Sequence, residues 1–125
     1  MPSISAQTAT HVEDHGVAVD RYGDIEGHTV NFVTIHEPSD LAPLLADMPD
    51  GRCPCPHWGY VFTGSLTFTF ADRQETYQPG DAFVVIGGHT PAAAGGTEFV
   101  IFSPAEELAV VTEAMNARMQ AMMQA

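Results

Sequence analysis

The sequence predicts an all-β fold, either a barrel or a sandwich, followed by one C-terminal helix. Short apolar segments follow one another at close spacing with turn-forming residues between them, which is typical of such folds. The clearest segment is 65–70, where large apolar and small polar side chains alternate with the two-residue period of a strand. After residue 103 apolar residues recur at intervals of three and four, which indicates a helix.

The first half of the barrel is expected to contain two strands. Residues 1–15 are expected to form a loose N-terminal arm, and the barrel itself to span 16–103. One short strand is predicted at 17–22, and a second at 29–35, which is rich in β-branched and aromatic residues. Residues 38–49 include three prolines, so we expect a loop with one helical turn at most.

The second half gives the stronger β pattern. A strand at 57–63 runs into Gly64, and the alternating strand at 65–70 pairs back onto 74–78 after a turn. Pro79-Gly80-Asp81 is a second turn, because proline and glycine occupy turn-forming positions there. Two further strands are expected at 82–86 and 97–102, joined by a loop rich in glycine and alanine.

The last segment, 104–125, is predicted to be a helix of the same domain. Ser103, Pro104 and Glu106 match a capping box with proline in the first helical position, so the helix should begin at Ser103 or Pro104. The helix carries one apolar stripe, formed by Leu108, Val111, Met115, Met119 and Met122. This stripe either docks on the barrel or forms a dimer contact; a methionine-rich metal-trafficking site would be a third use of it.

Composition limits the possible partners. The chain has 125 residues, the size of one domain, and its longest unbroken apolar stretch, 82–86, is far shorter than a membrane helix of about 20 residues. The start has neither the basic nor the apolar region of a secretory signal, so we expect a cytoplasmic location. The net charge of −12, with no lysine, disfavours nucleic acids and anionic membranes as partners. Small molecules, metals or a second copy remain.

Both cysteines lie in the segment Cys53-Pro54-Cys55-Pro56-His57. The prolines favour an extended backbone, in which Cys53, Cys55 and His57 project to one side. A disulfide between positions two apart would be strained, because their Cβ atoms are about 7 Å apart along a strand. Two thiols and an imidazole suit a borderline metal such as zinc. Alternatively, the cysteines are small buried apolar residues and the histidine is bonded to a carbonyl.

A fourth metal ligand would have to come from another strand, and His89 is the candidate. It lies in Gly87-Gly88-His89-Thr90-Pro91, at the end of the strand that follows the second turn. His36 ends a strand and carries less weight, while the remaining histidines lie in the arm or at a turn: His11, His15 and His28.

The segment 53–102 resembles the small, single-domain bacterial cupins of the RmlC-like superfamily. Tyr60-Val61-Phe62-Thr63-Gly64 is similar to the end of the first cupin motif, and 79–91 is similar to the second. By this resemblance His89 is the metal-binding histidine of the second motif, His57 stands at the usual glutamate position and Cys53 at that of the second histidine. The resemblance implies a jelly-roll β-barrel with a site in its mouth, and a homodimer, since a methionine-rich helix also leaves apolar surface to cover.

Departures from the family pattern change the expected chemistry. The usual three histidines and one glutamate become Cys53, Cys55, His57 and His89, and these softer donors favour zinc over the iron of an oxygenase. One hypothesis is a cupin that binds a divalent metal and a small organic ligand in the barrel mouth, and that acts as a metal-dependent enzyme. The alternative is a metal-free binding or sensory cupin without catalysis.

The strand at 57–63 contains a conflict between its two faces. Gly59, Val61 and Thr63 share the face of His57, while the bulkier residues lie on the other face: Trp58, Tyr60 and Phe62. The bulky face would normally be the core. In a barrel both faces can be covered, with the small residues lining a ligand cavity and the large ones packing beneath the N-terminal strands or the helix. The metal hypothesis weakens if the face of His57 looks at solvent.

Overall fold

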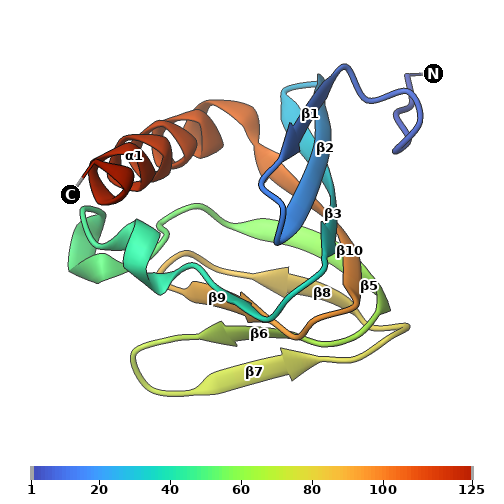
Figure 1. The fold of residues 1–125 in the computed structure, drawn as a ribbon. Coiled ribbons are helices and arrows are strands. Elements are labelled where there is room, and N and C mark those ends of the chain that lie inside the picture. Colours follow the sequence, from blue (N-terminus) through green and yellow to red (C-terminus); the bar gives the residue numbers. More distant parts are fainter. Residues whose placement is uncertain (1, 125) are drawn as a thin grey trace.

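The structure is a computed structural model that describes residues 2–124, and it consists of two antiparallel sheets with one long helix at one end (Figure 1). The larger sheet has the order β1-β2-β3-β10-β5-β8 and the smaller one the order β4-β9-β6-β7. The strands are β1 (His11–Asp14), β2 (Ala18–Ile25), β3 (His28–Ile35), β4 (Ser39–Asp40), β5 (His57–Thr63), β6 (Leu66–Thr69), β7 (Gln74–Tyr77), β8 (Ala82–Val85), β9 (Thr90–Ala93) and β10 (Thr97–Pro104). The helices are η1 (Ala42–Leu45), η2 (Pro49–Gly51), both 3₁₀, and α1 (Ala105–Met123).

The main core lies between the facing sides of the two sheets. Its centre is Phe68 of β6, which packs against Phe83 of β8 with the ring centroids 5.6 Å apart. The buried core residues are Ile35, Val61, Leu66, Phe68, Phe70, Phe83, Val85 and Phe99. The alternation predicted at 65–70 is confirmed, since Leu66 and Phe68 are buried while Thr67 and Thr69 are only partly covered.

The conflict between the faces of β5 is resolved by packing from the neighbouring strand. Phe83 pairs with Gly59, and its ring occupies the place of the missing side chain, because a Cβ at Gly59 would lie 2.5 Å from Phe83 Cζ. The inner face of β5 is therefore core although its own residues are small. The outer face, with Trp58, Tyr60 and Phe62, is 38–49% exposed.

Helix α1 docks through the first part of its apolar stripe. Val111 is buried in a second, smaller core with Leu45 of η1 and both cysteines, and Leu108 and Met115 pack against it. The prediction that this stripe docks on the barrel is confirmed as far as Met115. Met122 lies near the helix end and is 50% exposed. None of the helices within residues 2–124 is long and apolar enough to cross a membrane.

Three local predictions were wrong. Residues 11–14 were expected to belong to a loose arm, but they form β1, which pairs with β2. β9 forms within the stretch expected to be a glycine- and alanine-rich loop. The segment 38–49 agrees with the expected loop and single helical turn, which is η1, and adds the two-residue strand β4. The capping box at Ser103 does not form: α1 begins at Ala105, and no side chain caps it. The Ser103 hydroxyl is used elsewhere, at His57.

Candidate metal centre

The segment 53–57 is extended, as its two prolines predict. Burial alternates along it, with Cys53, Cys55 and His57 buried at 1–5% exposure and Pro54 exposed. The predicted alternation is therefore seen in the burial of these residues. His57 is also the first residue of β5, so the strand pairing of β5 with β10 and β8 fixes its position.

Backbone hydrogen bonds bring the second segment, around His89, to the first. The Cys53 amide donates to the carbonyl of His89 at 2.7 Å, and the Gly88 amide donates to the carbonyl of Cys53 at 2.8 Å. Gly87 lies tightly against the Pro54 carbonyl, and Gly88 has a φ of +96° that favours glycine. The two glycines before His89 thus allow the close approach that places its ring beside Cys53.

Three of the four predicted ligands come together. One donor atom each from Cys53, His57 and His89 lies within 4.8 Å of the other two, and Cys53 Sγ is 3.9 Å from His57 Nε2. The His57 and His89 ring centroids are 4.9 Å apart. The two histidines therefore share one face of the sheet and one site, although 32 positions separate them.

Each imidazole is held through its Nδ1 atom, which leaves Nε2 for the site. His89 Nδ1–H donates to the carbonyl of Ile86 at 2.7 Å, so the tautomer with a free lone pair on Nε2 is the one selected. His57 Nδ1 is hydrogen-bonded to Ser103 Oγ at 2.7 Å. His89 Nε2 is buried and has no hydrogen-bond partner within residues 2–124. Hydrogen bonds to the ring nitrogen that does not bind the metal orient metal-binding histidines in proteins.

Burial keeps all three groups uncharged when no cation is present. It lowers the pKa of His57 to about 3, with a smaller contribution from the neighbouring His89, and it lowers the pKa of His89 as well. It raises the pKa of the Cys53 thiol. Neutral imidazoles are the form that binds metal, and a bound divalent cation would lower the thiol pKa again.

Cys55 is the predicted ligand that lies outside this group. Its Sγ is 3.4 Å from the carbonyl of Pro56, and the residue is part of the small core with Leu45 and Val111 under α1. Burial raises the pKa of the Cys55 thiol to about 12, with Cys53 and Glu107 adding to the effect. The structure thus brings together the donor atoms of Cys53, His57 and His89 and leaves the Cys55 thiol outside this group, although both cysteines belong to the small core under α1.

The remaining histidines lie away from the centre. His11 stacks on Tyr22, His15 is 3.5 Å from Glu13, and His28 Nδ1 is 3.0 Å from the carbonyl of Glu26. One residue of the site was not foreseen. Ser103 was interpreted as a helix cap, and nothing local to it indicated a partner 46 residues away.

The donor set fits a borderline divalent metal. Two imidazole nitrogens and one thiol sulfur match the ligands that zinc prefers, and no carboxylate is among them. The walls are apolar, with the ring centroids of Phe68 and Phe70 at 5.0 and 6.1 Å from that of His89. Three protein ligands leave one tetrahedral position for a ligand from outside the group.

Comparison with known proteins supports the fold. No family model and no curated protein matches the chain. Solved structures do match: an RmlC-like cupin from Shewanella frigidimarina has 18% identity and a TM-score of 0.54, with 82% of this chain and 88% of that chain covered. The polyketide cyclase RemF from Streptomyces resistomycificus has 15% identity and a TM-score of 0.57, with 83% and 79% covered. KdgF from Halomonas sp. has 16% identity and a TM-score of 0.53, with 83% and 94% covered.

Proposed function

We propose that this chain, which has the fold of a small cupin, binds a divalent metal ion through Cys53, His57 and His89, and that the metal is zinc. The observation that carries the proposal is the buried Nε2 atom of His89, which has no partner within residues 2–124 and faces two further donors. A buried nitrogen acceptor without a partner is costly, and a metal ion would satisfy it together with the other two groups.

A bound divalent metal would polarise a carbonyl oxygen or lower the pKa of a coordinated water. The residues of this chain have their own tasks beside it. Ser103 and the Ile86 carbonyl hold the two rings in orientation, and Phe68 and Phe70 exclude water from the His89 side. The exclusion of water strengthens every electrostatic interaction in the site.

The small organic ligand is proposed to lie on the inner face of the larger sheet, beside the metal. In the strand register Ser103 pairs with Thr29 of β3, and Asn31 lies two residues further along. From the spacing of the strands and the rise per residue, the Cα atoms of Asn31 and His57 are about 12 Å apart. This distance is about the length of a small organic molecule. Asn31 Oδ1 is buried and has no partner in the described part of the chain, so it is available to a ligand hydroxyl or amino group.

The metal is tested by measuring the metal content of untagged protein after reconstitution with zinc or cobalt and removal of excess ion. We expect one metal ion per chain in the wild type, and loss of it in Cys53→Ser and in His89→Ala. Cobalt adds a sulfur-to-metal absorption band that reports Cys53 directly. Cys55→Ser is the matched control, since it makes the same change two residues away in an equally buried cysteine.

Two results would contradict the proposal. If folded Cys55→Ser lost the metal as completely as Cys53→Ser, the three-residue assignment would be wrong. If wild-type protein retained no stoichiometric metal, the site would be packing only, and a metal-free binding cupin would be the better interpretation. In that case the cysteine variants would lose stability, while His89→Ala would change little else.

A further inference from the structure

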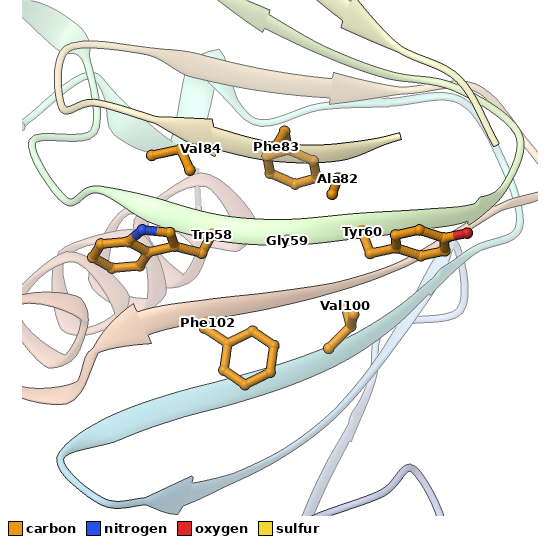
Figure 2. Close-up of a pocket in the computed structure, with 8 residues that line it drawn as sticks. All are labelled: Trp58, Gly59, Tyr60, Ala82, Phe83, Val84, Val100 and Phe102. Carbon is orange, nitrogen blue, oxygen red and sulfur yellow. The ribbon is translucent and has the colours of Figure 1, made fainter. Parts of the chain in front are cut away.

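The two faces of the larger sheet differ in chemistry. The outer face carries a shallow hollow lined mainly by apolar and aromatic side chains, among them Trp58 and Phe102 (Figure 2). The inner face is apolar where it contributes to the main core, but toward β1 it becomes polar and acidic. We call the group formed there by Glu13 of β1, Asp20 of β2 and Asn31 of β3 the acidic corner.

Strand register places the acidic corner on the inner face. Asp20 pairs with Val33, which packs against the main core, and Glu13 pairs directly with Asp20. Asn31 lies two residues before Val33 on β3 and therefore shares its face; its side-chain nitrogen donates to both Asp20 oxygens, at 3.1 and 3.0 Å. The Tyr22 hydroxyl donates to Glu13 at 3.0 Å and holds this carboxylate on the same side. The three side chains thus meet on the face where the ligand is proposed to lie, and both acidic residues are only half-buried.

The acidic corner offers hydrogen-bond acceptors without a matching cation. Asn31 is 8% exposed, and its Oδ1 atom has no partner within residues 2–124. Asp20 takes part in none of the ion pairs that the described residues form. Its sequence neighbour Arg21 alternates to the outer face and is exposed. His15 lies 3.5 Å from Glu13 and is the weakest of the four influences on the pKa of Asp20.

This arrangement is costly for the folded chain when nothing is bound. Glu13 and Asp20 stand directly opposite one another on neighbouring strands, and like charges in such positions destabilise a sheet. Burial of Asp20 adds to the cost and raises the pKa of its carboxyl to about 6, so above this pH the group is mainly ionised. A buried acceptor without a donor, as at Asn31 Oδ1, is also unfavourable. A positively charged hydrogen-bond donor would offset all three costs at once.

We propose that the acidic corner binds the protonated amino group of a small organic ligand. A primary ammonium group has three N–H donors and one positive charge, which match the two carboxylates and the Asn31 Oδ1 atom. A metal ion fits less well, because the one cluster of His, Cys, Asp or Glu donors among the described residues that could hold a metal is the candidate metal centre, and Asp20 is not part of it. The inference rests on the proposed function in one respect, the position of the organic ligand on the inner face, and it does not require the metal.

The test compares two ligands of equal chain length, butylammonium and butanol, on the untagged protein at about pH 7.5 and constant ionic strength. Their Kd values are read by NMR titration of the Asn31 side-chain amide signals. Butylammonium should bind at least about tenfold more tightly than butanol, because hydrogen bonds to charged groups are stronger than those between uncharged groups. Tetramethylammonium, which has the charge but no N–H donor, should bind more weakly than butylammonium.

Three substitutions locate the site. Asp20→Asn keeps the shape of the side chain and should abolish the preference for butylammonium over butanol. Asp24→Asn is the matched control, since it removes the same charge from an exposed residue four positions along β2, and it should leave Kd unchanged. His89→Ala, which should lose the metal, should also leave the Kd for butylammonium unchanged.

Three results would each overturn the inference: butanol binding as tightly as butylammonium, Asn31 signals that butylammonium does not shift, or an Asp24→Asn variant that loses as much affinity as Asp20→Asn. The last result would mean that the negative charge of the whole chain attracts the cation without a defined site. A wild type that binds butylammonium but no metal would support this inference and contradict the proposed metal centre. A wild type that binds metal but shows no preference for butylammonium would overturn this inference alone.

Discussion

Replacing Asp20 with asparagine should stabilise the protein above pH 6. Burial raises the pKa of the Asp20 carboxyl from 3.8 to about 6; the Asn31 amide, which donates to both of its oxygens at 3.1 and 3.0 Å, opposes this only in part. The folded state therefore binds a proton at this position more tightly than the unfolded state. The stabilisation by this group is fully present below about pH 4 and is lost as the pH rises to about 6.

The magnitude follows from the same two pKa values. The difference between 3.8 and about 6 corresponds to about 3 kcal/mol of unfolding free energy above pH 6, at 1.36 kcal/mol per pH unit. In Asp20→Asn the new amide remains uncharged, accepts from Asn31 and donates to Asn31 Oδ1, the buried atom that has no partner within residues 2–124. Allowing for weaker uncharged hydrogen bonds, we expect a gain of about 2 kcal/mol at pH 7.5.

The assay is thermal unfolding of wild type and variant at several pH values from about 4 to 8. A gain of about 2 kcal/mol raises Tm by about 8 °C for a domain of this size at pH 7.5, and the difference should vanish toward pH 4. Asp24→Asn is the control, because Asp24 is an exposed residue on the same strand and the Thr29 hydroxyl, which donates to it at 2.7 Å, can donate equally to an amide oxygen, so it should give little change. A lower Tm for Asp20→Asn at pH 7.5, or a difference that does not depend on pH, would refute the reasoning.

Two further predictions concern the metal site and the backbone. Ser103→Ala should keep one metal ion per chain but bind it about 10–100-fold more weakly, because His57 Nδ1 loses its hydrogen-bond partner. Competition with a chelator measures the affinity. An unchanged affinity would show that the hydroxyl does not orient the ring. Gly64→Ala should lower the unfolding free energy by clearly more than the about 1 kcal/mol expected for Gly16→Ala: both glycines have a φ of +79°, but only at Gly64 would the new Cβ collide with Thr97. Denaturant unfolding measures both, and equal losses would argue against the collision.

Local patterns in the sequence were sufficient for the strands of the barrel. The alternation at 65–70 and the β-branched run at 29–35 correspond to β6 and β3, because each strand has one face that meets the core. Two strands gave no such pattern. β9 contains Pro91 and small residues, which have low strand propensity, and β1 is mostly polar and, among the described residues, pairs only with β2. Both segments are strands because they pair with neighbouring strands, and their own side chains do not indicate a strand.

The site could be predicted as a group of residues but not in every detail. The prolines at 54 and 56 fix the alternation of the chain, so the buried side of Cys53, Cys55 and His57 follows from the sequence. The division between Cys53 and Cys55 does not follow from it. Both cysteines pack in the small core with Val111 of α1 and Leu45 of η1. Only the fold shows that the Cys53 thiol lies beside His57 and His89, while the Cys55 thiol contacts the carbonyl of Pro56.

Ser103 shows why a local signature can be outweighed by a contact distant in sequence. The pattern at 103–106 matches a capping box, whose hydroxyl would stabilise the helix by about 1 kcal/mol. The strand register places Ser103 beside His57 instead, and a buried imidazole nitrogen without a partner would cost about as much or more. Because Ser103 is fully buried and α1 begins at a water-accessible surface, solvent can serve the helix end but not His57.

The distribution of protons in the site distinguishes a metal centre from polar packing. Without a cation, the Cys53 thiol has only contacts of 3.9 Å to the Cys55 carbonyl and to His57 Nε2, and His89 Nε2 has no partner within residues 2–124. When His57 carries its proton on Nδ1 and donates to Ser103, the site holds two lone pairs and one weak donor. These three groups cannot satisfy one another, so in this tautomer polar packing alone leaves the cost of burial uncompensated. A divalent cation accepts both lone pairs and a thiolate at once, and the second nitrogen of each ring is already engaged. The arrangement therefore supports the proposed metal centre over polar packing alone.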